Sequence, residues 1–192
     1  MPGKIRRISS LFLMALALVA GCGARTSVHI RQDMDFSYIK RVAVLPFKNL
    51  SGVSNGDEII RNFVINELLV SGYTDVEVPG DVTAAVTKLG VVDPHSPTEN
   101  EIREIGKACK VQAVVFGTIE HWNDVKTGSG SSPAITLTIM MADANSGTII
   151  WSVTRTEGGH GFIAGQLGLR SGTMTGVALK AVRNAVRTLA KY

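Results

Sequence analysis

The residue whose surroundings point most directly to chemistry is Cys22, one of two cysteines in the 192 residues. A cationic start, Lys4 to Arg7, precedes an uninterrupted apolar run over residues 11–20, and small residues stand directly before Cys22. This layout is typical of a secretory signal peptide. The run has about half the length that a bilayer-spanning helix needs. We therefore expect residues 1–21 to be removed from the mature chain.

The cleavage region reads Leu18-Val19-Ala20-Gly21-Cys22 and resembles the lipobox of bacterial lipoproteins. The resemblance implies cleavage between Gly21 and Cys22, and lipid such as palmitate on the sulfur and amino group of Cys22. Such chains anchor a protein at about 0.8 kcal/mol per buried methylene. Gly23 stands where, in enteric bacteria, an aspartate would retain a lipoprotein in the inner membrane, so the resemblance favours the outer membrane. The alternative is an ordinary signal peptide followed by an unrelated cysteine.

Other reactive side chains do not fall into a recognised constellation. Asp33 and Asp35 lack further oxygen ligands nearby, so we expect no cation site there. We also expect no Gly-x-Ser-x-Gly motif of the kind that holds a serine nucleophile. Gly128-Ser129-Gly130 lacks the lysine and the following helix of a phosphate loop. The four histidines lie far apart and lack metal-ligand spacings: His29, His95, His121 and His160. We predict no metal, no cofactor besides the covalent lipid, and no enzymatic activity.

The charge balance and the second cysteine argue against two further functions, nucleic-acid binding and thiol chemistry. Removing residues 1–21 takes away three cations and no acid, which leaves 17 of the 20 Lys and Arg residues beside 16 acids in 171 residues. This balance gives no reason to expect nucleic-acid binding. With Cys22 lipidated, Cys109 has no partner for a disulfide within the chain. It follows Ile102 and Ile105 at helical spacing, so we expect it to be a buried core residue rather than a reactive thiol.

The remaining chain predicts one α/β domain. Residues 22–38 are expected to be the lipidated cysteine and a short tether, with a short edge strand where Val28 and Ile30 alternate with polar residues. Apolar runs predict buried strands in 40–47, 74–78 and 111–119, and apolar stripes predict helices over 57–71, 81–89, 98–110 and 174–191.

Alternating residues around 135–141 and 149–154 predict a hairpin with half-buried strands. Because helices connect the first three strands, these should run parallel. We therefore expect a mixed five-stranded sheet, three parallel strands plus a C-terminal antiparallel hairpin, packed with about four helices in a single domain over residues 39–192.

Two surfaces are candidates for binding. The loops after the first, third and fifth strands should share one sheet edge, where ligands of open α/β sheets bind. The candidate residues of this edge are Asn49, Ser51, Asn55, Trp122, Asp124 and His160. The candidate face for contact with anionic lipid or an acidic partner is Lys180, Arg183, Arg187 and Lys191. The alternatives are merely mobile loops and an ordinary solvated helix face.

Several segments resemble one family of bacterial lipoproteins. They are Asp35-Phe36-Ser37, residues 39–47, Asn49, Gly52, Gly72-Tyr73, residues 114–119 and residues 143–151. The family includes the curli-secretion channel CsgG and the penicillin-binding-protein activator LpoB, and its fold is similar to the N-terminal domain of TolB. The resemblance implies a TolB-like fold, but it says much less about the molecular function.

Departures from this family limit what can be carried over. The segments that correspond to the membrane hairpins of CsgG are 121–133 and 157–172, and both are shorter than the roughly 20 residues that such a hairpin needs. A secretion pore is therefore disfavoured, and a short tether does not suit the wall-crossing role of LpoB.

The combined expectation is a lipid-anchored protein on the periplasmic face of the envelope. It would be a non-enzymatic binding or assembly component, with the membrane and an unidentified envelope protein as partners. The alternatives are a homo-oligomeric CsgG-like ring or collar without membrane-spanning hairpins, and an enzyme whose residues the sequence does not reveal.

Overall fold

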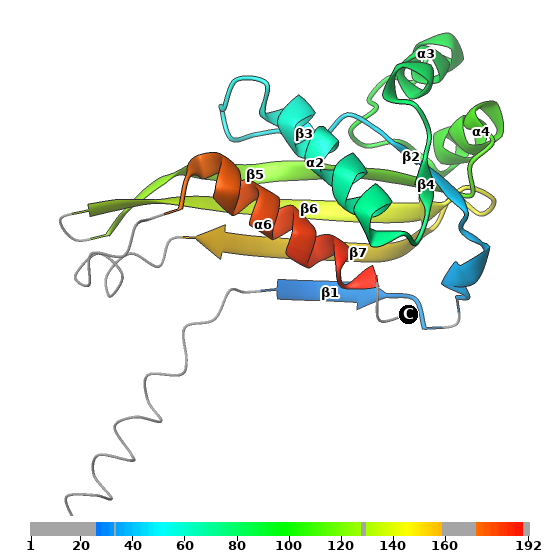
Figure 1. Ribbon diagram of the computed structural model, residues 1–192. Coiled ribbons are helices and arrows are strands. Elements are labelled where there is room, and N and C mark those ends of the chain that lie inside the picture. The colour runs from blue at the N-terminus through cyan, green and yellow to red at the C-terminus, as the bar shows by residue number, and fades with distance from the viewer. Residues whose placement is uncertain (1–25, 33, 128–129, 159–171, 190–192) are drawn as a thin grey trace, which may run out of the picture.

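Seven strands form one mixed sheet in the computed structural model, which describes residues 26–32, 34–127, 130–158 and 172–189 (Figure 1). The strand order is β1-β7-β6-β5-β2-β4, and the short β3 pairs with β5. The strands are β1 (Thr26–Ile30), β2 (Arg41–Val44), β3 (Lys48–Asn49), β4 (Asp75–Val76), β5 (Ala113–Thr127), β6 (Gly130–Asp143) and β7 (Ile149–Gly158). The helices are the 3-10 helix η2 (Phe36–Tyr38), α2 (Gly56–Ser71), α3 (Pro79–Leu89), α4 (Glu99–Cys109) and α6 (Met174–Val186).

The parallel half of the sheet agrees with the prediction. Strand β2 pairs in parallel with β4 and with β5, and Val42 lies opposite Val76 on one side and Ala113 on the other. The predicted capping box begins α4, where the hydroxyl of Thr98 accepts from the backbone N–H of Glu101 and the Glu101 carboxylate accepts from the Thr98 N–H at 2.7 Å. The prediction of four helices and three parallel strands is thus confirmed for the described residues. The prediction of five strands was wrong, because β1 pairs with β7 and the short β3 pairs with β5, which makes seven.

The antiparallel half is longer than predicted. Strands β5 and β6 stay paired from Ala113 opposite Asp143 to Thr127 opposite Gly130. Residues 122–127 and 130–133, which belong to the loop expected after the third predicted strand, therefore form the end of this hairpin. Trp122 and Ile135 lie opposite each other there and both are buried. Ile135 belongs to the predicted alternating strand, but Trp122 does not, because polar residues flank it in the sequence: His121, Asn123 and Asp124.

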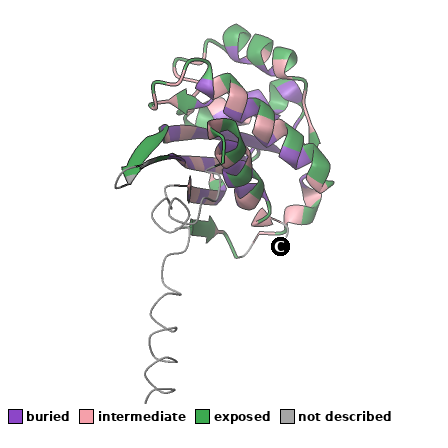
Figure 2. Cartoon of the chain, turned by 60° about the vertical axis from the view of Figure 1, so that its left-hand side comes forward, coloured by how far each residue is buried: buried purple, intermediate pink, exposed green. Residues whose placement is uncertain are grey.

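Two apolar cores lie on the two faces of the sheet. The larger core packs α2 and α6 on one face, with Val44, Ile60, Leu137 and Trp151 among its fully buried members. The smaller core packs α3 and α4 on the other face. Figure 2 shows the buried residues between the sheet and its helices, and the exposed end of the β5–β6 hairpin projecting beyond them.

Strand β1 places the N-terminal segment in the sheet. It pairs antiparallel with β7, with Thr26 opposite Arg155 and Ile30 opposite Trp151, so the predicted edge strand is present. Much of the segment expected as a tether, residues 26–32 and 34–38, therefore forms β1 and η2 and packs on the domain. Between Cys22 and β1 stand only residues 23–25, which lie outside the described residues together with the expected leader.

Candidate functional site

The loop after β3, part of the predicted binding edge, is held by its own polar side chains. The Asn49 side chain accepts hydrogen bonds from the backbone N–H and the hydroxyl of Ser51, at 3.0 and 2.7 Å. Its amide nitrogen donates to the Val53 carbonyl at 2.8 Å. Asn49 and Ser51 thus shape the loop, while Asn55 is exposed in the left-handed conformation that precedes α2.

The aromatic member of the predicted edge is part of the core. Trp122 is 2% exposed, and its indole N–H donates to the Met174 carbonyl at 3.2 Å. A β-carbon on Gly56 would lie 3.0 Å from the Asn49 amide and 3.4 Å from the Trp122 ring, so loop and ring meet closely there. Asp124 lies exposed farther along β5, and His160 lies outside the described residues. Trp122 therefore supports the loop but does not offer its ring to a partner.

A Gly-x-Ser-x-Gly pattern occurs in this loop at Gly52-Val53-Ser54-Asn55-Gly56, contrary to the expectation that none exists. It does precede a helix, but the left-handed residues are Gly52 and Asn55 rather than the serine. No histidine or carboxylate of the described residues makes a hydrogen bond with the exposed Ser54. The pattern therefore lacks the adjacent base that activates a serine nucleophile.

The basic face of α6 is partly neutralised. Lys180 lies 2.7 Å from the carboxylate of Glu157, and Arg183 lies 3.0 Å from that of Glu67. Arg187 is exposed, and Lys191 lies outside the described residues. Two of the four predicted cations thus hold α6 to β7 and to α2, which weakens this face as a free site for anions.

Glu157 is the centre of a buried polar cluster that sequence reasoning missed. Its carboxylate also accepts from Arg155 at 3.0 Å and from the Asn184 amide at 3.3 Å. Burial opposes the charge, but hydrogen bonds and charge from Lys180 and Arg155 outweigh it and lower the pKa of Glu157. The cluster is a structural one, because each of its contacts joins β7 to itself or to α6.

No metal site is assembled from the part of the chain that the structure describes. His29 and His121 are exposed on different strands, and a ring nitrogen of His95 lies 3.2 Å from the Pro46 carbonyl. Cys109 is buried, as predicted, and burial together with the charges of Glu77 and Asp81 raises the pKa of its thiol. A raised pKa disfavours the reactive thiolate.

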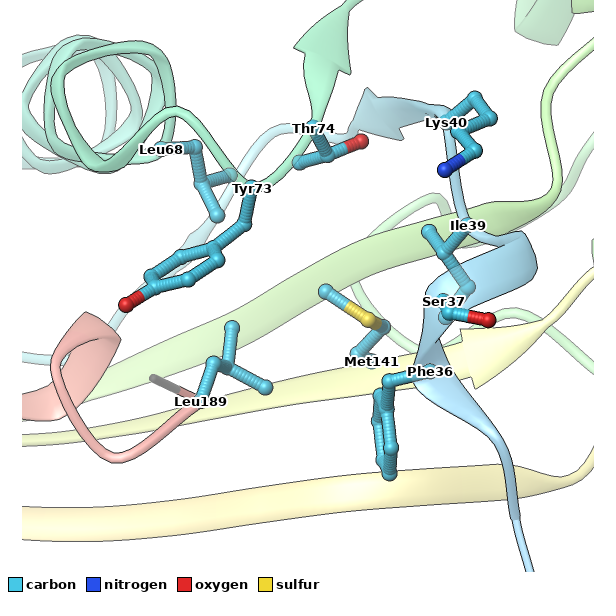
Figure 3. A pocket seen from close by; sticks show the side chains of 9 residues that line it. All are labelled: Phe36, Ser37, Ile39, Lys40, Leu68, Tyr73, Thr74, Met141 and Leu189. Carbon is cyan, nitrogen blue, oxygen red and sulfur yellow. The ribbon is translucent and has the colours of Figure 1, made fainter. Parts of the chain in front are cut away.

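An apolar cavity of about 310 Å³ opens where α2 and α6 end, at the level of the sheet where β1 ends and Met141 lies opposite Trp151 (Figures 1 and 3). Six apolar or aromatic side chains line it: Phe36, Ile39, Leu68, Tyr73, Met141 and Leu189. Ser37, Lys40 and Thr74 complete the lining. Sequence reasoning missed this cavity because its walls come from five separate segments of the chain.

Exposed apolar residues adjoin a second cavity on the same side. This cavity, of about 440 Å³, lies between α2 and α6 and shares Tyr73 with the first. Val70 is 73% exposed and Leu69 is 51% exposed. Glu67 and Arg183 also line this cavity, so it is more polar than the first. None of the helices in the described ranges is long and apolar enough to cross a membrane.

No family model and no curated protein matches this sequence. Solved structures do match it. The PelC dodecamer from Paraburkholderia phytofirmans has a TM-score of 0.57 at 18% identity, over 84% of this chain and 96% of that chain. Lipoprotein GNA1162 from Neisseria meningitidis has a TM-score of 0.51 at 17% identity, over 80% and 99%. Hypothetical protein CT253 from Chlamydia trachomatis has a TM-score of 0.52 at 13% identity, over 80% and 97%.

These likenesses cover nearly the whole of each matched chain. They show the fold: this chain has the mixed α/β fold of the PelC subunit and of a bacterial lipoprotein. The narrower grouping with CsgG, LpoB and TolB stays a prediction.

Proposed function

We propose that this chain is a lipid-anchored lipoprotein of the bacterial cell envelope that acts as a non-enzymatic binding or assembly component. The observation that carries the proposal is the position of β1, whose first residue, Thr26, follows Cys22 by four residues and pairs with Arg155 of β7. Four residues span at most about 14 Å. A lipid on Cys22 would therefore hold the folded sheet directly beside the membrane.

The start of β1 and the apolar cavity lie at different levels of the sheet (Figure 1). Thr26 lies level with Arg155 of β7 and Leu137 of β6, whereas Met141 of the cavity lies opposite Trp151, level with Ile30 at the end of β1. Four strand residues separate Leu137 from Met141, which at about 3.3 Å per residue amounts to roughly 13 Å. The cavity would thus lie farther from the lipid than the start of β1, where it would be accessible to a partner in the periplasm.

Three titratable groups, Arg61, Asp143 and Glu157, are engaged within the fold, which supports a non-enzymatic role. Buried Arg61 donates to the carbonyls of Val44 and Pro79, which holds α2 to the end of β2 and the start of α3. Asp143 and Glu157 are likewise occupied by hydrogen bonds within the fold. Groups committed to structure in this way are not free to exchange protons with a substrate.

Fractionation of cells that express wild type, Cys22→Ser and Cys109→Ala tests the anchor. The wild type and Cys109→Ala should be processed and found with the outer membrane. Cys22→Ser should accumulate as unprocessed precursor. Cys109→Ala is the matched control because it removes the other cysteine without touching the lipobox. A Cys22→Ser variant that is matured and located like the wild type would overturn the proposal.

A ring of identical subunits is the second candidate function, favoured by the solved structure of PelC as a dodecamer. Here the lipid would tether many copies to one patch of membrane, as a collar without membrane-spanning hairpins. Light scattering of the detergent-solubilised protein distinguishes the ring from a monomeric binding component. A fixed large mass supports the ring, and a monomer excludes it.

A further inference from the structure

The cavity of Figure 3 has apolar walls on several sides. Leu68 and Tyr73 form one side, Met141 and Leu189 lie across from them, and Phe36 and Ile39 close the remainder. A volume of about 310 Å³ lies at the lower end of the range of about 300–1,000 Å³ that is usual for ligand pockets. An apolar lining and a volume of this size fit one small apolar group.

The polar groups of the lining differ in whether they are free to contact a ligand. The Ser37 hydroxyl donates to Asp35 at 2.8 Å, and the Thr74 hydroxyl donates to the Asp75 carbonyl at 3.2 Å. Both hydroxyl protons are thus already used within the chain. Lys40 is exposed beside Thr74 at the rim and takes part in none of the ion pairs among the described residues.

Two carboxylates lie near this rim and bear on its charge. Asp35 is fully exposed, and the backbone N–H and hydroxyl of Ser37 occupy its two oxygens, which lowers its pKa, as does the charge of Lys40 more weakly. Asp75 is exposed next to Thr74. Neither forms an ion pair with Lys40, so the Lys40 ammonium remains the one cationic donor of the lining that is available to a ligand.

We propose that this cavity binds a fatty acid, with the alkyl chain between Met141 and Leu68 and the carboxylate on the Lys40 ammonium. An alkyl chain matches the small apolar space, and a single anionic group matches the one available cation of the lining. The ligand is a free fatty acid and not the lipid of the chain itself, because acyl chains joined to Cys22 through ester or amide bonds have no carboxylate for Lys40.

This inference goes beyond the proposed function and fails separately from it. The cavity lining among the described residues contains no residue of the lipobox, so binding can be measured on the mature chain, residues 22–192, carrying Cys22→Ser. The absence of lipid removes the need for detergent, which would compete for the cavity. The probe is sodium decanoate below its micelle concentration, and the comparison ligands are decyltrimethylammonium and butyrate.

Two neighbouring methionines provide the first readout. Met141 lines the cavity, whereas Met140 packs against the core on the other face of the sheet. In a chain with ¹³C-labelled methionine methyl groups, decanoate should shift the Met141 signal saturably and leave the Met140 signal in place. Equal shifts of both signals, or no saturable shift, would overturn the proposal without any variant at all.

Calorimetry supplies the second readout. Decanoate should bind at least fivefold more tightly than decyltrimethylammonium, and butyrate should not bind measurably. Lys40→Gln should weaken the affinity for decanoate about two- to fivefold, as expected for the loss of a solvent-exposed ion pair. Lys88→Gln, which removes an exposed lysine from α3, should leave binding unchanged.

Leu189→Trp places a larger side chain in the cavity and should weaken the affinity for decanoate more than tenfold. A thermal melt checks that this variant folds. The proposal fails if carboxylate and ammonium ligands bind alike, or if folded Leu189→Trp binds decanoate like the wild type.

Discussion

The hydroxyl of Tyr38 donates a hydrogen bond of 2.7 Å to the carboxylate of Asp143, which lies 105 residues later in the chain. The second oxygen of Asp143 accepts from the backbone N–H and the hydroxyl of Ser146, each at 2.7 Å. One carboxylate therefore joins η2 to the turn between β6 and β7. Through this bond the segment between β1 and β2 is fixed to the sheet.

Tyr38→Phe should lower the free energy of unfolding by about 1–2 kcal/mol, because it leaves one oxygen of a partly buried carboxylate without its donor. Tyr73→Phe is the control, since the Tyr73 ring is 52% exposed and its hydroxyl makes no hydrogen bond with a described residue. Urea denaturation followed by circular dichroism measures both. Similar stabilities for the two variants would show that the Tyr38 bond does not hold η2.

The stability that Asp143 contributes should depend on pH. Burial opposes its charge, but hydrogen bonds from Tyr38, Ser146 and Asn145 together lower its pKa below the ordinary value of 3.8. A carboxyl whose pKa is lower in the folded state stabilises the fold above its unfolded pKa, about 3.9, and loses this contribution as pH falls through the folded value. The difference in unfolding free energy between wild type and Asp143→Asn should therefore shrink from pH 6 to pH 2. A difference that stays constant over this range would contradict the assignment.

Glu157→Gln should destabilise the fold by about 1.5–3 kcal/mol, because the buried carboxylate accepts charged hydrogen bonds from Arg155 and Lys180. Glu104→Gln is the matched control. Glu104 pairs with Lys107 at 2.9 Å, but both side chains are exposed, so its loss should cost under about 0.5 kcal/mol. Equal costs in urea titrations would mean that the Glu157 cluster does not anchor α6.

Gly117→Ala should cost about 1–3 kcal/mol through overpacking. A β-carbon at Gly117 would lie 2.2 Å from the Thr138 carbonyl oxygen and 2.6 Å from the Phe47 ring. Gly80→Ala makes the same change at a position in α3 where nothing lies within 4 Å, and it should stabilise the helix by about 0.5 kcal/mol. Melting temperatures that move in the same direction for both variants would contradict this account of the β5–β6 contact.

Local signals were sufficient to predict much of this fold. The apolar stripes gave helices within a few residues of α2, α3 and α4, because each helix buries one face and carries its own end signals. Thr98 and Glu101 form their capping box, and Gly72 ends α2 in the left-handed conformation with φ of 70°. The order of strands and helices also predicted which strands run parallel, since that follows from connectivity alone.

Features that depend on pairing between distant segments were not predictable in the same way. β3 has only two residues and exists because Lys48 meets Thr118. Trp122 was expected at an accessible edge, but the extended β5–β6 pairing places it on the core face. The cavity at Lys40 and the Glu157 cluster likewise need contacts between segments that no local pattern links.

The mass of the N-terminal peptide measures directly whether Cys22 carries lipid. Trypsin should release residues 22–25, Cys22-Gly23-Ala24-Arg25, from the purified mature protein. We predict that this peptide starts at Cys22 and carries the added mass of a diacylglyceryl group, with or without an amide-linked acyl chain. An unmodified Cys22, or a mature chain that begins at any other residue, would contradict the account.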